Sequence, residues 1–388
     1  MNVPKLRFKE FKDEWSTIEL SKISSEISYG MGLPSKEYDG INKYIRITDI
    51  DENTSKYTNK DIVSPDGELE DKYIVKKNDI LFARTGASTG KTYLYDKKDG
   101  KLYYAGFLIK ANIINHDANF IFQQTHTSKY NKWIKVMSMR SGQPGINSQE
   151  YGSYKFLITS KTEEYKISKT LQLLDKKIEL QTNKIEDLKL FKKGLINHII
   201  ENNKIEKISL KNILVEQNNK TSKNNEYEIL SSTSKGIYLQ KDYFNKQAAS
   251  DNNIGYKILK KNQLVLSPQN LWMGNINVNT EYNIGIVSPS YKIFNISNNI
   301  NIDFFNYWIK SPKALFEYKI SSEQGASIVR RNLNMDLFYE IIVDVPRGKL
   351  QNKVGKIIKL LNLNIQYNEF LLQKLSELKK GLMQNMFV

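Results

Sequence analysis

Cysteine is absent from this sequence of 388 residues, and histidine occurs only three times. Without cysteine there are no disulfides and no thiolate metal sites, and His116, His126 and His198 offer no metal-ligand spacing. No stretch approaches the ~18 consecutive apolar residues that cross a membrane, and the first twenty residues lack the apolar run of a signal peptide. We therefore expect a soluble cytoplasmic protein with no membrane segment and no metal site of its own.

Acidic side chains are also in short supply relative to basic ones. The chain has 42 acidic against 58 basic residues, a formal charge of +16 and a pI near 9.4. An excess of positive charge on this scale indicates a polyanionic partner, and DNA is the commonest polyanion inside cells. Charge alone leaves open a protein that is merely basic, so the order of residues has to decide.

The sequence repeats itself. Leu188–Leu195 reads Leu-Lys-Leu-Phe-Lys-Lys-Gly-Leu, and Leu375–Leu382 reads Leu-Ser-Glu-Leu-Lys-Lys-Gly-Leu, at an offset of 187 residues. Three weaker matches precede these segments at slightly different offsets: Tyr44–Thr48 with Tyr227–Ser231, Lys76–Leu81 with Lys260–Val265, and Trp133–Lys135 with Trp308–Lys310. Changing offsets indicate short insertions and deletions, which loops tolerate.

Each copy carries an apolar series in steps of three and four residues, which is typical of a helix that packs against a partner helix. The two series are Ile167, Leu171, Leu174, Ile178, Ile185, Leu188, Phe191 and Leu195, and Val354, Ile358, Leu361, Ile365, Leu372, Leu375, Leu378 and Leu382. An amide interrupts each series at the same place, Gln181 and Asn368. If the helices pack antiparallel, these amides pair and fix the register; the alternative is two unrelated surface amides.

The resulting order is globule, long helix, globule, long helix, with boundaries at 1–160, 161–203, 204–346 and 347–388. The globules contain short segments typical of strands, at Asp79–Phe82, Leu108–Ile114, Leu264–Leu266 and Tyr291–Ile296. Two further segments are typical of helices, Lys129–Met139 and Asp303–Lys310. We predict an α+β fold, in which two β-rich mixed globules are joined by two long helices packed as an antiparallel coiled coil with a pseudo-twofold repeat.

A helix from Ile167 to Leu195 is about 44 Å long at ~1.5 Å per residue. Half-sites on one face of B-DNA recur every ~34–36 Å. Two diverged globules held apart by such helices therefore suit a split, asymmetric DNA target with an unread spacer. The alternative is a helical hairpin that only separates two structural domains.

At this point the sequence resembles the specificity (S) subunits of type I restriction–modification systems. The start, Pro4-Lys5-Leu6-Arg7-Phe8 with Trp15 and Leu20, is similar to the usual start of these subunits, and the end, Leu378–Phe387, to their usual end. The resemblance covers the whole chain and includes the repeat.

The resemblance implies two target-recognition domains that bind double-stranded DNA, and helices that act as a ruler. It implies two methyltransferase (M) subunits, which bind S-adenosylmethionine and methylate adenine. Restriction (R) subunits, with ATP- and Mg-dependent translocation and nuclease activity, can join them. No catalytic residue and no cofactor are expected in this chain.

Base recognition needs paired donors or acceptors on loops carried by a stiff core. In the first globule, the loop Arg84–Lys91 is similar to the family's Arg- and Gly-rich loop, with Arg84 and Thr85 at its start. We expect Arg84 to contact a guanine and Lys91 a phosphate; an internal salt bridge of Arg84 is the alternative.

A second loop of the first globule also matches a family pattern and contains Arg140, Gln143 and Asn147. The two amides suit adenine, whereas the alternative is a capped turn without DNA contact.

The second globule has no arginine in the loop equivalent to Arg84–Lys91. Gln269 and Asn270 are the candidates there, and the neighbouring Trp272 is a candidate core residue. A later loop contains Arg330 and Arg331, of which we expect at least one to contact DNA.

Two other functions stay open. One is the target-recognition subunit of a different bipartite methyltransferase–nuclease. The other is a standalone metal-dependent endonuclease that uses Asp66 and Glu70, although the four residues from one to the other leave little room for the usual strand and turn.

Overall fold

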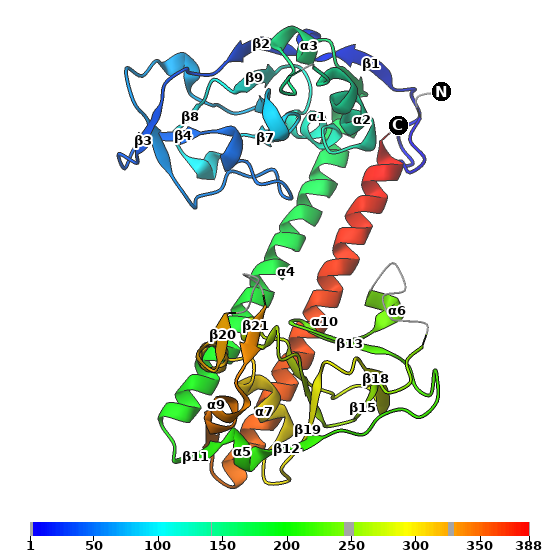
Figure 1. Ribbon diagram of the computed structural model, residues 1–388. Coiled ribbons are helices and arrows are strands. Elements are labelled where there is room, and N and C mark those ends of the chain that lie inside the picture. The colour runs from blue at the N-terminus through cyan, green and yellow to red at the C-terminus, as the bar shows by residue number, and fades with distance from the viewer. Residues whose placement is uncertain (1–2, 141, 244–251, 325–329, 388) are drawn as a thin grey trace. The chain divides into compact units, whose positions relative to one another are not determined.

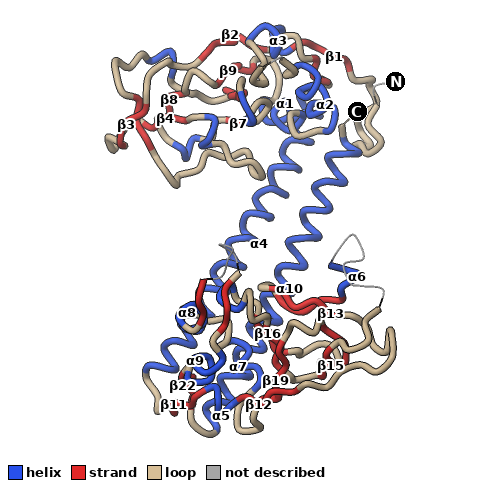
Figure 2. The backbone as a smooth tube through the Cα atoms, in the orientation of Figure 1, coloured by secondary structure: helices blue, strands red, loops and turns tan. Residues whose placement is uncertain are grey.

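The computed structural model describes residues 3–140, 142–243, 252–324 and 330–387. Contacts between residues divide the chain into two compact units. Unit 1 comprises Met1–Thr182 with Leu371–Val388, and unit 2 comprises Asn183–Phe370. Each unit combines helices and small sheets with half of each long helix (Figures 1 and 2), so the predicted α+β class is confirmed. The predicted boundaries of four domains stay a prediction.

Each unit is built around one four-stranded antiparallel sheet, and the two sheets have the same strand order. In unit 1 the order is β2-β9-β6-β7, and in unit 2 it is β12-β19-β16-β17. The strands of unit 1 are β2 (Ser24–Tyr29), β9 (Leu108–Ile113), β6 (Asp79–Ala83) and β7 (Thr92–Leu94). Those of unit 2 are β12 (Leu214–Gln217), β19 (Lys292–Ile296), β16 (Leu264–Leu266) and β17 (Ile276–Val278). The internal repeat is therefore a repeat of topology.

Strand pairs outside these sheets repeat in part. β1 (Ser16–Glu19) pairs with β10 (Lys155–Ile158), as β11 (Ile205–Ser209) does with β22 (Ile342–Pro346). The other pairs of unit 1 are β3 (Ser35–Glu37) with β5 (Val63–Pro65) and the parallel pair β4 (Lys43–Ile45) with β8 (Leu102–Tyr104). The other pairs of unit 2 are β13 (Leu230–Thr233) with β14 (Gly236–Leu239), β15 (Lys257–Lys260) with β18 (Ile284–Val287), and β20 (Ser322–Gln324) with β21 (Arg331–Leu333).

The shorter helices follow the same order in both units. A helix pair succeeds β9 and β19, and another helix precedes the last strand. In unit 1 these are α1 (Ala118–Gln124), α2 (Ser128–Met137) and α3 (Ser148–Gly152); in unit 2 they are α7 (Ile302–Trp308), α8 (Pro312–Ile320) and α9 (Met335–Glu340). Unit 2 adds α5 (Leu210–Ile213) and α6 (Gln240–Tyr243).

The turn that leads into the central strand is the same in both units and explains one of the sequence matches. Asn78 and Asn262 have left-handed backbones, with φ of 68° and 66°, a conformation that asparagine tolerates better than most residues. The Asp79 carboxylate accepts from the Lys76 backbone N–H at 2.7 Å, and the Gln263 amide oxygen from that of Lys260, also at 2.7 Å.

The match of Trp133–Lys135 with Trp308–Lys310 is wrong. Trp133 lies in α2, the second helix of its pair, whereas Trp308 ends α7, the first helix of the other pair. The position in unit 2 that corresponds to Trp133 lies in α8. The three identical residues are a coincidence, because the helix pairs repeat in topology but not in their side chains.

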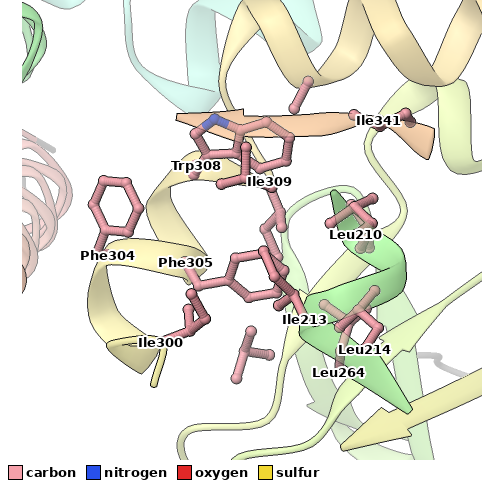
Figure 3. Close-up of a cluster of buried hydrophobic side chains, with 14 of the residues drawn as sticks. Leu210, Ile213, Leu214, Leu264, Ile300, Phe304, Phe305, Trp308, Ile309 and Ile341 are labelled. Carbon is pink, nitrogen blue, oxygen red and sulfur yellow. The ribbon is translucent and has the colours of Figure 1, made fainter. Parts of the chain in front are cut away.

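The core of unit 2 lies between its sheet and helices α5, α7 and α9. Phe305 and Trp308 of α7 stack with ring centroids 6.4 Å apart, and Leu210, Ile213 and Leu264 belong to the same cluster (Figure 3). Ile196 of the first long helix and Ile358 of the second are also part of this core, so the long helices are integral to the unit.

The two long helices are α4 (Lys161–Glu201) and α10 (Lys349–Met386), and they pack antiparallel. In unit 1 the Lys379 amine lies 2.6 Å from the Asp175 carboxylate. In unit 2 the Lys192 amine donates to the Asn362 amide oxygen at 2.8 Å. At the offset of 187 residues Lys192 corresponds to Lys379 and Asn362 to Asp175, so the repeat places equivalent contacts in both units. No helix in the described ranges is long and apolar enough to span a bilayer.

The predicted apolar series is confirmed except at its seventh member in each helix, the third apolar residue after the amide. Ile167, Leu171 and Ile185 are buried, as are Val354, Ile358 and Ile365. Phe191 and Leu378, at equivalent positions, are 58% and 53% exposed, so their assignment to the seam was wrong. Each residue turns the helix by ~100°, so two successive steps of three residues place the last side chain about 120° from the first around the helix axis. The last side chain therefore lies off the buried face.

Both ends of the chain contribute to unit 1. The Leu6 N–H donates to the Asn385 carbonyl at 2.8 Å, and the buried Phe387 ring lies 6.4 Å from that of Trp15 and 5.5 Å from that of Phe120. The start and end that carry the family resemblance therefore belong to one core.

A buried ion pair fixes the N-terminal segment on α4. Arg7 donates two hydrogen bonds to the Glu163 carboxylate, at 2.7 and 2.8 Å, and the Trp15 indole N–H lies 3.3 Å from the same group. The Glu163 side chain is inaccessible to solvent, and Arg7 leads the interactions that hold the pKa of this carboxyl below its ordinary value against the effect of burial. Losing either partner would leave a buried charge unpaired.

Replacing Phe387 by alanine is expected to lower the free energy of unfolding by about 3–5 kcal/mol, the usual loss for a buried phenylalanine. Urea unfolding followed by tryptophan fluorescence measures it. The control is Phe191→Ala, which removes an exposed ring and should cost far less. Equal losses in the two variants would contradict the role of Phe387 in the core.

Candidate nucleic-acid interface

Two loops that are distant in sequence lie together at the end of β6 in unit 1. The Ile146 N–H donates to the Arg84 carbonyl and the Gly86 N–H to the Pro144 carbonyl, both at 2.9 Å, and Thr85 and Gly145 form an isolated antiparallel bridge. We call Arg84–Lys91 with Arg140–Asn147 the first loop cluster; Ser141, within it, lies outside the described residues. The structure thus brings both predicted loops of the first globule onto one surface.

A glycine turn returns the chain from Arg84 to β7. Gly90 has a left-handed backbone with φ of 92°, and a Cβ there would approach the Ile134 side chain to 2.7 Å. Its N–H donates to the Ala83 carbonyl at 3.0 Å, and the Ala83 N–H donates to the Lys91 carbonyl at 2.8 Å. Glycine is therefore needed both for conformation and for space, and the loop is held at both ends.

Arg84 is held by an aromatic ring. Its guanidinium carbon lies 4.8 Å from the centroid of the Tyr29 ring, within the range of a cation–π interaction, and Nη1 lies 3.4 Å from the Gly106 carbonyl. The Tyr29 hydroxyl accepts from the Ser148 N–H at 3.0 Å. Among the described residues Arg84 forms no salt bridge, so the internal ion pair is not what fixes it. Sequence gave no signal for Tyr29, because only the fold brings β2 beside the loop.

The other candidates of this cluster differ in how far they are engaged. Lys91 pairs with Glu52 at 2.9 Å, and Arg140 with Glu150 at 2.5 Å. The Asn147 side chain accepts from the Glu150 N–H at 2.9 Å and caps α3, which confirms the capped turn at this residue. Gln143 is exposed. Contact of these side chains with DNA stays a prediction.

The corresponding surface of unit 2 is formed by Ser267–Gly274, after β16, and by the hairpin Gln324–Leu333, of which 325–329 lie outside the described residues. We call it the second loop cluster. The Arg331 N–H donates to the Gln269 carbonyl at 3.2 Å, which joins the two segments. Gln269 is exposed, whereas Asn270 and Trp272 are half-buried.

The two arginines of this cluster are not equivalent. Arg331 Nε donates to the Ser322 hydroxyl at 2.9 Å, and its Nη2 donates to the Ser322 and Lys319 carbonyls. These bonds hold the hairpin against the end of α8. Arg330 is exposed to solvent and is the better placed of the two to meet a ligand.

Lys310 stabilises the second loop cluster by hydrogen bonds to two backbone carbonyls. Its amine donates to the Gly274 carbonyl at 2.6 Å and to the Ser234 carbonyl at 3.1 Å. Gly274 has a left-handed backbone with φ of 84°, so the lysine bonds at the point where the loop turns back. Burial lowers the pKa of Lys310 to about 8. The sequence did not reveal this role, because a lysine after a helix is ordinary.

The carboxylates considered for a nuclease lie on the surface of unit 1. Asp66 is 3.6 Å from the Lys36 amine, and Glu70 pairs with Lys72 at 2.7 Å. Within the described ranges no group of three or more His, Asp or Glu side chains is placed to hold a metal ion.

Comparison with known proteins gives the same class for sequence and fold. Residues 13–190 match the family described as Type I restriction modification DNA specificity domain. The chain resembles the S subunit of a type I restriction–modification system from M. genitalium, with 15% identity and a TM-score of 0.64, over 100% of this chain and 99% of that one. A chain from a structure on complex assembly and conformational transition of the type I system matches with 10% identity and a TM-score of 0.51, over 96% and 97%.

The fold is thus that of a type I restriction–modification S subunit over the whole chain. The sequence match to the type I restriction–modification DNA specificity domain covers residues 13–190.

The lowered pKa of Lys310 predicts a dependence of stability on pH. The amine of the unfolded chain titrates near its ordinary value of 10.5 and that of the folded chain near 8, so protonation favours unfolding. The associated stability is fully present above the unfolded pKa and is lost as the pH falls toward 8.

The free energy of unfolding of the wild type, relative to Lys310→Met, should therefore rise between pH 8 and 10, by about 1 kcal/mol per pH unit. Below about pH 7, where the amine is protonated in both states, the difference should be constant. Chemical denaturation across this range measures it, and parallel curves for the two proteins would contradict the assignment.

Proposed function

We propose that this chain is the DNA-specificity subunit of a type I restriction–modification complex. It binds a split, asymmetric double-stranded DNA target and directs methyltransferase and endonuclease subunits to it. The observation that carries the proposal is a pair of equivalent frameworks with unlike loops. The two sheets have the same strand order, but unlike loops follow the equivalent strands β6 and β16. These loops are Arg84–Lys91 in unit 1 and Ser267–Gly274 in unit 2. One framework with two sets of side chains suits two different half-sites.

Each cluster offers groups with the chemistry for base recognition. Arg84, oriented by Tyr29, presents a donor pair that matches guanine in the major groove. The exposed amides, Gln143 in unit 1 and Gln269 in unit 2, suit adenine, and Asn147 and Asn270 lie beside them. Lys91, Arg140, Arg330 and Arg331 suit phosphates, where they fix position without reading sequence. Thr85 holds the loop through its bridge to Gly145.

Equivalent positions on the long helices expose apolar side chains, which supports two copies of one partner. The equivalent pairs at the offset of 187 are Leu173 with Leu360, Leu180 with Tyr367, and Phe191 with Leu378, and each of these side chains is more than half exposed. Repeated exposed apolar positions on a helix are typical of interaction surfaces. The partners proposed for them are two M subunits.

Catalysis belongs to these partners in this proposal. The M subunits carry S-adenosylmethionine, R subunits carry ATP and Mg, and this chain contributes neither catalytic residues nor a cofactor. A different bipartite methyltransferase–nuclease is the nearest other function. A standalone endonuclease would require metal-dependent cutting by the pure chain, abolished by Asp66→Ala.

The direct test is single-molecule methylation sequencing of host DNA with and without this gene, its neighbours intact. We expect adenine methylation at one split, asymmetric motif that disappears on deletion and returns on complementation. Methylation that is unchanged although the gene is expressed in the control would refute the proposal.

We also propose that α4 and α10 set the spacer between the half-sites, and that Gln181 and Asn368 pair to fix their register. Inserting four helical residues after Gln181 adds ~6 Å of helix, against ~3.4 Å per base pair. The methylated motif should keep both half-sites and gain spacer, by two base pairs at most. The control is a variant in which the four residues after Gln181 are replaced by other residues, none of them glycine, so that the length of the helix is unchanged. An unchanged spacer, or altered half-sites, would show that the helices are not the ruler.

A further inference from the structure

A rigid turn next to the first loop cluster holds the aromatic ring of Phe107 in solvent. Ala105–Phe107 connects β8 to β9, the Ala105 N–H donates to the Ile45 carbonyl at 3.0 Å, and the Leu108 N–H donates to the Ala105 carbonyl at 2.8 Å. Gly30 crosses this turn so closely that a Cβ there would lie 2.3 Å from the Ala105 carbonyl oxygen. The turn is therefore fixed on both sides.

Phe107 is 58% exposed, whereas Ala105 and Leu108 on either side of the turn are buried. Ala105 and Leu108 belong to the core, Leu108 without any exposed surface. Leaving most of a phenylalanine ring in water forgoes much of the stabilisation that its burial would contribute. Because the backbone is fixed, the ring is presented outward by the fold itself.

The turn also holds the proposed guanine reader. The Arg84 N–H donates to the Phe107 carbonyl at 3.0 Å, and the Arg84 guanidinium lies 3.4 Å from the Gly106 carbonyl. The exposed ring and the proposed guanine reader are therefore carried by hydrogen-bonded neighbours in the backbone.

Unit 2 has no aromatic residue at the equivalent position. Phe82 pairs with Ile109 in unit 1 and Leu266 pairs with Lys292 in unit 2, so the strand registers align Phe107 with Ser290, which is exposed. The exposed ring therefore distinguishes the first cluster from the second.

We propose that Phe107 contacts the C5 methyl group of a thymine in the half-site read by unit 1, next to the base read by Arg84. The base edges in the major groove present donors and acceptors, and the thymine methyl is the apolar group among them. An exposed phenyl ring gains little from a polar edge but buries area against a methyl group. The inference deepens the proposed function and rests on it.

The test uses the complete complex of this chain with its methyltransferase partners and duplexes that carry the motif found by methylation sequencing. Each thymine of both half-sites is replaced in turn by deoxyuridine, which removes only the methyl group. One replacement should weaken wild-type binding about four-fold, the equivalent of ~0.8 kcal/mol for one buried methyl group. With Phe107→Ala the same replacement should have no effect, and with Phe107→Leu it should keep part of its effect.

Phe316→Ala is the matched control, since that ring is 61% exposed on α8 of unit 2; it should respond to deoxyuridine as the wild type does. The proposal is overturned if no replacement weakens wild-type binding, or if the sensitive thymine stays sensitive with Phe107→Ala. It is also overturned if Phe107→Ala weakens binding to all sequences alike, since the ring would then act as a non-specific wedge. A wild-type complex that does not distinguish the motif from unrelated DNA would instead refute the proposed function.

Discussion

The rings of Phe387, Trp15 and Phe120 pack against one another, and the rest of the structure depends on this contact. It brings the end of the last helix into the core of the unit that contains the first strand. Because α4 passes from unit 1 to unit 2 and α10 from unit 2 to unit 1, each unit buries half of each helix. The helices are thus part of both cores and are not a linker attached to finished domains. A chain that lost this contact would keep its repeat but expose the apolar surface around Trp15.

A second consequence is that the frameworks can stay alike while the loops differ. The sheet order, the asparagine turn before the central strand and the cross-helix contacts of Lys192 and Lys379 are the same in both units. They are determined by hydrogen bonds and packing that do not involve the loops. The loops are supported separately, by Tyr29 beneath Arg84 in unit 1 and by Lys310 beneath Gly274 in unit 2. Substitutions in a loop can therefore change what is read without changing the fold.

Some of this was accessible from the sequence because local physics determines it. The long helices follow from an apolar period that persists over many turns, and the strands at Asp79–Ala83 and Leu264–Leu266 from buried runs after a turn signal. Phe191 and Leu378 were misplaced because apolar residues at steps of three drift off the buried stripe. Trp133 was matched with Trp308 because a short identity carries no topology. The contact of Tyr29 with Arg84 could not be predicted, since it depends on how β2 pairs with β9. The hydrogen bonds of Lys310 to two carbonyls could not be predicted either, because a lysine that follows a helix is ordinary and its local sequence does not indicate such a role.

The central claim is that two equivalent frameworks read two half-sites independently, and a hybrid chain tests it most directly. Residues 205–346 would be replaced by a second copy of 16–158, so that each segment runs from the start of its first strand to the end of its last strand. Methylation sequencing of a host that expresses the hybrid with its partners should show a new, palindromic motif. This motif should contain the half-site of unit 1 twice, in inverted orientation. Retention of the original asymmetric motif, or methylation unrelated to either half-site, would contradict the claim.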